Sequence, residues 1–190
     1  MNAINVYILI IGTYGFLDIF FQKNSKTIFF SKSKDKTYLP ILITFSLALT
    51  IPACEVLFLH RVINHFFFWL GAAMCLTGTY IRVKGQLELQ HGFSTRIEKQ
   101  ENHTLITTGL YSLVRHPLYL ALVLFLIGAS FMLSSYYSWI MIIINAYTLK
   151  IRIDKEEAFL IENFPAYEDY QKRTKKIIPF IWWLKRHCDK

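Results

Sequence analysis

The residues best suited to chemistry lie in three short motifs in the C-terminal half of the chain. HTLITTGLY occupies 103–111, VRHPLY occupies 114–119, and RIDKEE occupies 152–157. They combine guanidinium, imidazole, phenol and carboxylate groups, which bind anions, cations and aromatic rings. No Ser-His-Asp or Cys-His arrangement can be proposed from their spacing.

The dipeptide His116-Pro117 predicts a helix that begins beside a fixed positive charge. Proline is favoured at the first helical position, because its missing N–H would have no partner there. The free N–H groups and positive dipole end of such a helix attract a carboxylate or phosphate, and Arg115 adds charge beside it. Tyr111 and Tyr119 can stack on a ring or donate hydrogen bonds. Anchoring at a membrane interface, where Arg, His and Tyr are common, is the competing interpretation.

Charged residues at the ends of apolar runs pose a second choice between structure and function. Arg152 and Glu156 stand four apart and share a helix face, which fits a simple ion pair. A helical ion pair is more stabilising when the acidic residue precedes the basic one, and here the arginine comes first. An arginine at the end of a membrane span is also energetically costly, which favours a function for it. Glu55 receives the structural interpretation: the sequence predicts that its span ends at Pro52 and leaves Glu55 near the outer surface.

The elements that must position these motifs are apolar helices. Of the 190 residues 54% are hydrophobic and 18% are charged, below the roughly 25% charge of soluble domains. Five apolar runs appear, at 4–21, 38–59, 65–81, 117–133 and 136–149. The last is too short to span a bilayer unless it continues through Lys150 and Arg152. We expect one all-α integral-membrane domain, 1–190, with about five transmembrane helices.

Within that domain we expect three transmembrane helices in 1–81. The remainder, 82–190, is expected to hold two more helices, a polar loop and amphipathic C-terminal helices that together form the site. Small residues at Gly71, Ala72, Ala73 and Gly78 predict close packing of the third helix. Residues 154–176 read as a helix, a break at Pro165 and a second helix.

The distribution of charge predicts both partners and orientation. Of the 21 Lys and Arg residues, five lie in 22–37, five in 82–116 and ten from Lys150 onward. The positive-inside rule then puts the N-terminus outside and the C-terminus, with the three motifs, in the cytoplasm. The net charge is +8, and the basic residues that produce it flank apolar runs. This placement favours anionic lipid headgroups over nucleic acid as the partner.

The sequence lacks the motifs that bind several classes of cofactor. There is no G-x-G-x-x-G fingerprint and no phosphate-binding G-x-x-x-x-G-K-[ST] loop. The three cysteines form no C-x-x-C pair, and His91, His103 and His116 are too widely spaced for ligand pairs on one helix. The sequence therefore predicts no metal site.

Taken together, the three motifs resemble the C-terminal signature of the isoprenylcysteine carboxyl methyltransferase family of integral-membrane enzymes. The resemblance covers about 95–181 and is carried by HTLITTGLYSLVRHPLYL, by R-x-x-x-E-E and by FPAYEDYQKR-x(5)-PFI. It extends to a wider superfamily that includes phospholipid N-methyltransferases. The N-terminal half matches only in being transmembrane.

The resemblance implies S-adenosyl-L-methionine as cofactor and assigns a role to each motif residue. Residues implied to line the cofactor pocket are His103, Thr104, Leu105, Ile106 and Tyr111; those implied to hold its methionyl or ribose part are His116, Pro117, Leu118 and Tyr119. Glu156 would bind polar groups of the cofactor, and Arg152 would face the methyl acceptor. Two departures from the family pattern are Leu120-Ala121, where a glycine is frequent, and Arg96, where an uncharged polar residue is common.

The expected activity is methyl transfer to a lipophilic acceptor that enters from the bilayer, with a carboxylate as its methylated group. A phospholipid or small-molecule N- or S-methyltransferase is the nearest alternative. A nicotinamide-dependent membrane reductase and a non-enzymatic membrane scaffold are the others. The roles of Arg115 and Glu157, functional or structural, stay open at this point.

Overall fold

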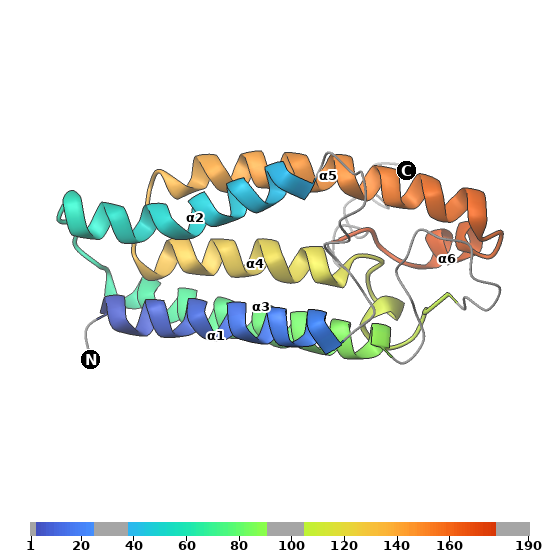
Figure 1. Ribbon diagram of the computed structural model, residues 1–190, viewed down its shortest axis with the longest axis horizontal. Coiled ribbons are helices and arrows are strands. Elements are labelled where there is room, and N and C mark those ends of the chain that lie inside the picture. Colours follow the sequence, from blue (N-terminus) through green and yellow to red (C-terminus); the bar gives the residue numbers. More distant parts are fainter. Residues whose placement is uncertain (1–2, 25–37, 91–104, 178–190) are drawn as a thin grey trace, which may run out of the picture.

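The computed structural model describes residues 3–24, 38–90 and 105–177, which fold almost entirely into helices (Figure 1). Its elements are α1 (Ala3–Asn24), α2 (Tyr38–Phe58), α3 (His65–Gln90), the 3₁₀ turn η1 (Gly109–Ser112), α4 (Pro117–Met132), α5 (Ser138–Asn163) and α6 (Tyr167–Arg173). Within these ranges the only β-structure is an isolated bridge between Val114 and Lys175. The expected all-α architecture is confirmed.

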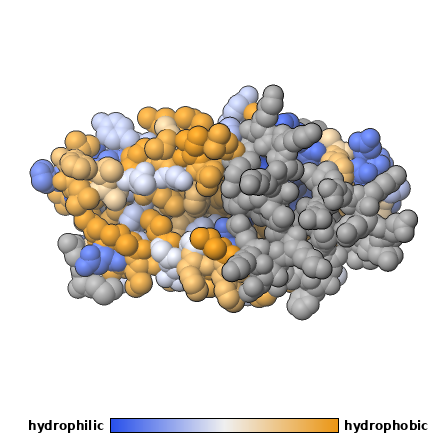
Figure 2. Space-filling view, viewed as in Figure 1, coloured by the Kyte–Doolittle hydropathy of each residue, from blue (hydrophilic) through white to orange (hydrophobic). Residues whose placement is uncertain are grey.

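Within the part of the chain that the structure describes, three helices are long and apolar enough to cross a membrane, over Ala3–Phe21, Leu39–Phe58 and His65–Leu89. The α4 helix is apolar but has only 16 residues. The α5 helix joins an apolar first half to a charged second half without a break, as the short fifth run predicted. Figure 2 shows apolar side chains covering the left part of one face of the molecule. The fold is that of an integral-membrane protein, while the number of five spans stays a prediction.

The α4 helix lies at the centre of the bundle, with α2 and α5 on one side and α1 and α3 on the other (Figure 1). Its contact with α3 is close because glycines face each other. A Cβ atom at Gly71 would lie 2.4 Å from the Gly128 carbonyl oxygen, and one at Gly78 would lie 2.9 Å from the Ala121 oxygen. The predicted close packing is confirmed at these glycines, whereas Ala73 faces outward.

The α2 helix corrects the prediction made for Glu55. It continues through Pro52 to Phe58, and Glu55 is only 3% exposed. The Glu55 carboxylate accepts hydrogen bonds from the Ser135 hydroxyl at 2.5 Å and from the Tyr136 and Tyr137 N–H groups at 3.0 and 2.9 Å. Those N–H groups precede α5 and have no partner within a helix. A buried carboxylate on α2 therefore caps the turn between α4 and α5.

The third helix also extends beyond its apolar run. Residues 82–90 were predicted to begin a polar loop, yet α3 continues to Gln90. Arg82 and Gln86 in this extension are 1% and 3% exposed. Arg82 Nε and Gln86 Nε2 both donate hydrogen bonds inside the bundle. Buried polar groups that are hydrogen-bonded in this way allow the helix to continue past its first charged residue.

Candidate active site

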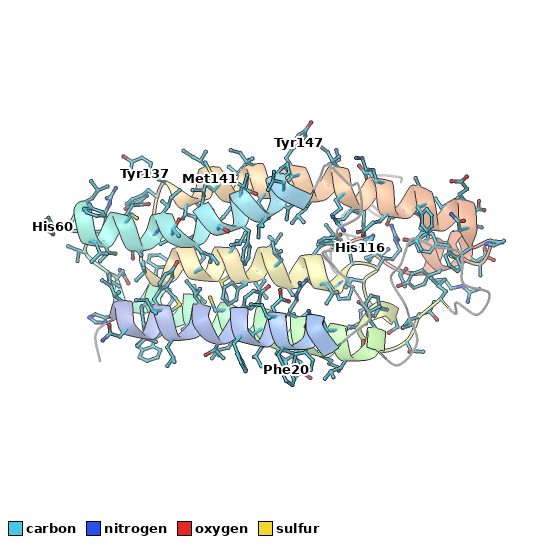
Figure 3. The ribbon with its side chains drawn as sticks, in the orientation of Figure 1. Phe20, His60, His116, Tyr137, Met141 and Tyr147 are labelled. Carbon is cyan, nitrogen blue, oxygen red and sulfur yellow. The ribbon has the colours of Figure 1, made fainter. Side chains whose placement is uncertain are left out.

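The second and third motifs meet where the first turn of α4 faces the charged half of α5. Figure 3 shows His116 at the end of α4 that faces the second half of α5. Pro117 is the first residue of α4, as the sequence predicted, and His116 is its N-cap. The continuous α5 helix carries the 152–157 motif to the same end of the bundle. Motifs that are more than 30 residues apart in sequence are thus in direct contact.

Tyr119, Arg152 and Glu156 form a cluster between α4 and α5. The Tyr119 hydroxyl donates to Glu156 Oε1 at 2.6 Å, and Arg152 Nε lies 2.8 Å from that hydroxyl oxygen and 3.1 Å from Glu156 Oε1. Tyr119 is 2% exposed, and the Arg152 side chain is 13% exposed. An exposed ion pair on one helix would leave the guanidinium free to rotate. Here a tyrosine from a second helix fixes its direction.

His116 and Glu157 form the second, more buried contact of the site. His116 Nε2 lies 3.1 Å from Glu157 Oε1. Since an ionised carboxylate can only accept, Nε2 carries the proton of this contact. Arg115 Nε donates to the same carboxylate oxygen at 2.8 Å, and Lys176 Nζ lies 3.1 Å from Oε2. Glu157 thus links Arg115-His116-Pro117, the RHP motif within VRHPLY, to α5 and to the segment that contains Lys176.

These contacts set the protonation of Glu157. Burial raises the pKa of its carboxyl group, but hydrogen bonds from His116, Arg115 and Lys176 outweigh burial and lower the pKa to about 2. Glu157 is therefore a fixed negative charge at neutral pH and no proton donor. Arg115 and Glu157, whose roles the sequence left open, hold His116 in place.

The segment after α6 binds directly to the RHP motif. The Arg115 N–H donates to the Lys175 carbonyl at 2.7 Å, and the His116 N–H donates to the Lys176 carbonyl at 3.1 Å. The Arg115 guanidinium also donates to the Thr174 carbonyl at 2.6 Å. The backbone before α4 is therefore held from outside by a segment almost 60 residues later in the chain.

Tyr111 lies in η1, on the side of the site near α3. Its carbonyl accepts from the Tyr170 hydroxyl at 2.6 Å, and the preceding residue, Leu110, donates its N–H to Glu88 Oε2 at 2.8 Å. The Tyr111 hydroxyl itself is buried and has no hydrogen-bond partner within the described part of the chain. Burial raises the pKa of this hydroxyl well above its usual value. A buried orphan hydroxyl indicates a polar partner that is still to be supplied.

The structure brings most of the predicted residues together. Leu105 and Ile106 are half-buried in the loop before η1, whereas Leu118 is buried against Gly85 of α3. His103 and Thr104 lie outside the described residues. Sequence analysis did not single out Glu88, Tyr170 or Lys176 as contributors. Only Tyr170 carried a signal, its place in the FPAYEDYQKR motif.

The low pKa of Glu157 predicts how stability depends on pH. A carboxyl whose pKa falls from 4.5 in the unfolded chain to about 2 in the fold stabilises the protein above about pH 4.5. That contribution is lost as pH falls from about 4.5 to about 2. We expect Glu157→Gln to lower the free energy of unfolding by about 3 kcal/mol at pH 7, measured by thermal melting in detergent.

The control for this prediction is the same comparison at acid pH. Protonation removes from the wild-type protein the charge that the variant already lacks, so the difference between their melting temperatures should shrink steadily below about pH 4.5. A difference that stays constant from pH 7 to pH 3 would show that Glu157 contributes packing and no charge interaction.

Comparison with known proteins shows which family this chain resembles. The family model described as isoprenylcysteine carboxyl methyltransferase (ICMT) matches residues 70–162, which include the RHP motif and Glu156. The protein-S-isoprenylcysteine O-methyltransferase of Saccharomyces cerevisiae is 32% identical over 75% of this chain and 56% of its own length. That of Schizosaccharomyces pombe is 31% identical over 57% of this chain and 47% of its own length. The chain thus spans about half the length of these curated relatives.

A solved structure shows the same similarity. The eukaryotic intramembrane Ras methyltransferase ICMT (isoprenylcysteine carboxyl methyltransferase) superposes with a TM-score of 0.66 and 25% sequence identity, over 92% of this chain and 68% of that chain. Sequence motifs, fold and relatives agree: this chain is similar to the isoprenylcysteine carboxyl methyltransferase family.

Proposed function

We propose that this chain transfers a methyl group from S-adenosyl-L-methionine to the carboxylate of a prenylated cysteine at the membrane. The observation that carries the proposal is the Tyr119–Arg152–Glu156 cluster, in which a guanidinium is held in a fixed direction at the junction of apolar and charged halves of α5. The relatives are named for O-methylation of S-isoprenylcysteine. An anionic, lipophilic acceptor fits both the arginine and its surroundings.

The described residues fit the cofactor in the chemistry of their groups. S-adenosyl-L-methionine presents a carboxylate, an ammonium group, ribose hydroxyls and an aromatic base. The N–H groups of Leu118 and Tyr119 begin α4 before its first intrahelical bond, which suits a carboxylate. The Glu156 side chain is 31% exposed and can accept from ammonium or hydroxyl groups. The orphan Tyr111 hydroxyl supplies one more polar group.

In this proposal the cofactor would be held by residues of the first two motifs and by the first carboxylate of the third. These are His103, Thr104, Leu105, Ile106, Tyr111, His116, Pro117, Leu118, Tyr119 and Glu156. Bound there, the cofactor supplies a methyl group on a positively charged sulfonium.

The chain's own residues then need to align and shield the reactants. A carboxylate acceptor is ionised at neutral pH, so its activation requires no general base. Arg152 holds the acceptor carboxylate by charge-assisted hydrogen bonds, while Tyr119 and Glu156 keep the guanidinium oriented. Fixed alignment and exclusion of water supply the rate enhancement.

The lipid tail of the acceptor meets apolar residues on the bilayer side of the cluster. Tyr119 belongs to a hydrophobic core shared by α2, α4 and α5, whose members include Leu122, Leu149 and Ile153. A tail entering between these helices would keep contact with apolar side chains while its carboxylate reached Arg152. A phospholipid amine would meet the same guanidinium unfavourably, which disfavours N-methyl transfer.

Calorimetry on the purified full chain in detergent tests the cofactor. S-adenosyl-L-methionine and its demethylated product should both bind with measurable heat, and NADPH should not. Binding of NADPH with no response to S-adenosyl-L-methionine would replace the proposal by the reductase alternative. A monodisperse sample that binds neither would point to the scaffold alternative.

We further propose that the site faces the cytoplasm. The C-terminal ends of α1 and α3 and the N-terminal ends of α2 and α4 lie toward the end of the bundle that carries the site (Figure 1). The basic segments 22–37 and 82–116 include the connections between these ends. The positive-inside rule puts such segments in the cytoplasm.

A reporter fusion measures this orientation. An enzyme that is active only in the cytoplasm should be active when fused after Lys190, and inactive when fused before Met1. The reverse pattern would invert the topology and place the site on the outer side of the membrane.

A further inference from the structure

Three polar side chains are buried together on the side of α4 opposite to Arg152. Asp18 lies on α1, and Arg82 and Gln86 lie one turn apart on α3. Arg82 Nε donates to Asp18 Oδ1 at 2.7 Å, and Gln86 Nε2 donates to the same oxygen at 2.9 Å. The Arg82 and Asp18 side chains are 2% and 15% exposed. An ion pair therefore lies inside the bundle.

Adhesion between α1 and α3 is a poor explanation for this pair. Asp18 and Arg82 both lie within stretches that are long and apolar enough to cross a membrane. The loss of hydration on burying two charges offsets their attraction, and well-packed apolar residues hold helices together at least as well. Ionisable residues within such helices are costly and typically serve function.

The pair reaches the site through the first turn of α4. Arg82 Nη1 lies 3.5 Å from the Leu118 carbonyl oxygen, and Arg82 also interacts electrostatically with Tyr119. The Leu118 side chain packs so tightly against α3 that a Cβ atom at Gly85 would lie 2.8 Å from Leu118 Cδ2. The α3 side thus holds Leu118, and α5 holds the next residue, Tyr119, through Arg152.

The layer around Arg82 also contains oxygen atoms without partners. Gln86 Oε1 and the Tyr111 hydroxyl are both buried without a hydrogen bond within the described residues. Tyr111 interacts electrostatically with Arg82 and with Glu156. Polar groups that serve only to join helices are normally satisfied. The orphan atoms therefore favour a role connected with the site.

We propose that Asp18 is a positioning residue for the methyl-transfer site. It fixes the Arg82 guanidinium against the Leu118 carbonyl, so that the first turn of α4 keeps the Tyr119 hydroxyl at Arg152 and Glu156. This inference rests on the proposed function. Neither Asp18 nor Arg82 touches acceptor or cofactor in this scheme, because both act through α4. The carboxylate charge matters, since asparagine offers the guanidinium only a neutral oxygen.

The test compares Asp18→Asn with Tyr7→Phe in the purified full chain. Tyr7→Phe is a matched control, because it removes another buried hydrogen bond of α1, from the Tyr7 hydroxyl to the Leu49 carbonyl, away from the first turn of α4. We expect Asp18→Asn to lower kcat about tenfold at saturating substrates, with a melting temperature close to that of the control. Asp18→Glu should recover part of the loss because it restores the charge.

Two further measurements separate positioning from stability. Hydrogen exchange of the amides of residues 118–122 should be faster in Asp18→Asn and unchanged in Tyr7→Phe. Arg82→Lys should lower kcat as Asp18→Asn does, and the double variant should lose little more, as expected of residues that act as one unit. Equal kcat and exchange in Asp18→Asn and the control would overturn the inference.

The same experiment distinguishes failure of the inference from failure of the proposed function. If the wild-type chain transfers no methyl group to any acceptor, the proposed function fails. The exchange measurement still decides whether Asp18 orders the first turn of α4, because it requires no turnover. If the wild type is active and Asp18→Asn matches Tyr7→Phe, only the positioning role is lost.

Discussion

Arg152→Lys is expected to lower methyl transfer at least tenfold while cofactor affinity stays within about twofold of wild type. The Arg152 Nε atom is held by both Tyr119 and Glu156, which leaves the planar guanidinium aimed in one direction. The lysine ammonium group is a compact point charge, so it cannot reproduce the planar, two-point contact of a guanidinium with a carboxylate. Turnover with a prenylcysteine acceptor, measured beside calorimetric cofactor affinity, provides the comparison.

The competing explanation makes a different quantitative prediction. If Arg152 were merely the partner of Glu156 on one helix, their interaction would contribute about 0.3–0.5 kcal/mol. Arg152→Lys would then retain at least about half of the wild-type turnover. The control is Lys150→Arg, a charge-preserving change at an exposed position of the same helix. Full activity in Arg152→Lys would contradict the carboxylate clamp and restore the N-methyltransferase alternative.

Glu156→Ala and Tyr119→Ala should each weaken cofactor binding at least tenfold. Loss of a charge-assisted hydrogen bond costs about 1.5–3 kcal/mol, and 1.4 kcal/mol corresponds to a factor of ten. Glu156→Ala removes the accepting carboxylate from the described site. Tyr119→Ala removes the hydroxyl that orients that carboxylate at 2.6 Å, and it also leaves a cavity in the core. The measurement is the dissociation constant of S-adenosyl-L-methionine by calorimetry.

Two comparisons keep this prediction specific. Glu162→Ala removes an exposed carboxylate from the same helix and should leave cofactor affinity unchanged. Tyr119→Phe removes the hydroxyl without the cavity, so weaker binding in this variant assigns the effect to the hydrogen bond. Wild-type affinity in Glu156→Ala, in a protein that remains folded, would remove Glu156 from the cofactor site.

Much of the fold follows from apolar runs and helix signals. The runs predicted the helices, Pro117 marked the start of α4, and Pro165 marked the break between α5 and α6. The continuation of α5 beyond Lys150 followed from the thickness of a membrane, because the apolar run alone was too short. These features depend on neighbours in sequence, which a single chain displays directly.

Contacts between distant segments were harder to predict. Spacing placed Arg152 and Glu156 on one face, but nothing in it showed that Tyr119 would join them from α4. Glu55 looked like a surface residue because its partners at the start of α5 are about 80 residues away. For the same reason the pairing of Asp18 with Arg82 could not be foreseen. Buried polar pairs are formed by tertiary packing between distant segments. In the sequence, each partner alone looks like an ordinary charged residue near the end of a helix.

The most direct test of the proposed activity is methyl transfer to an S-prenylated N-acetylcysteine from S-adenosyl-L-methionine labelled in its methyl group. The purified full chain should release label from the lipid product as methanol on mild base treatment, since a methyl ester is base-labile. Arg152→Lys should release at least tenfold less. Label that enters the lipid but resists base, or enters only a phospholipid amine, would contradict carboxyl methylation.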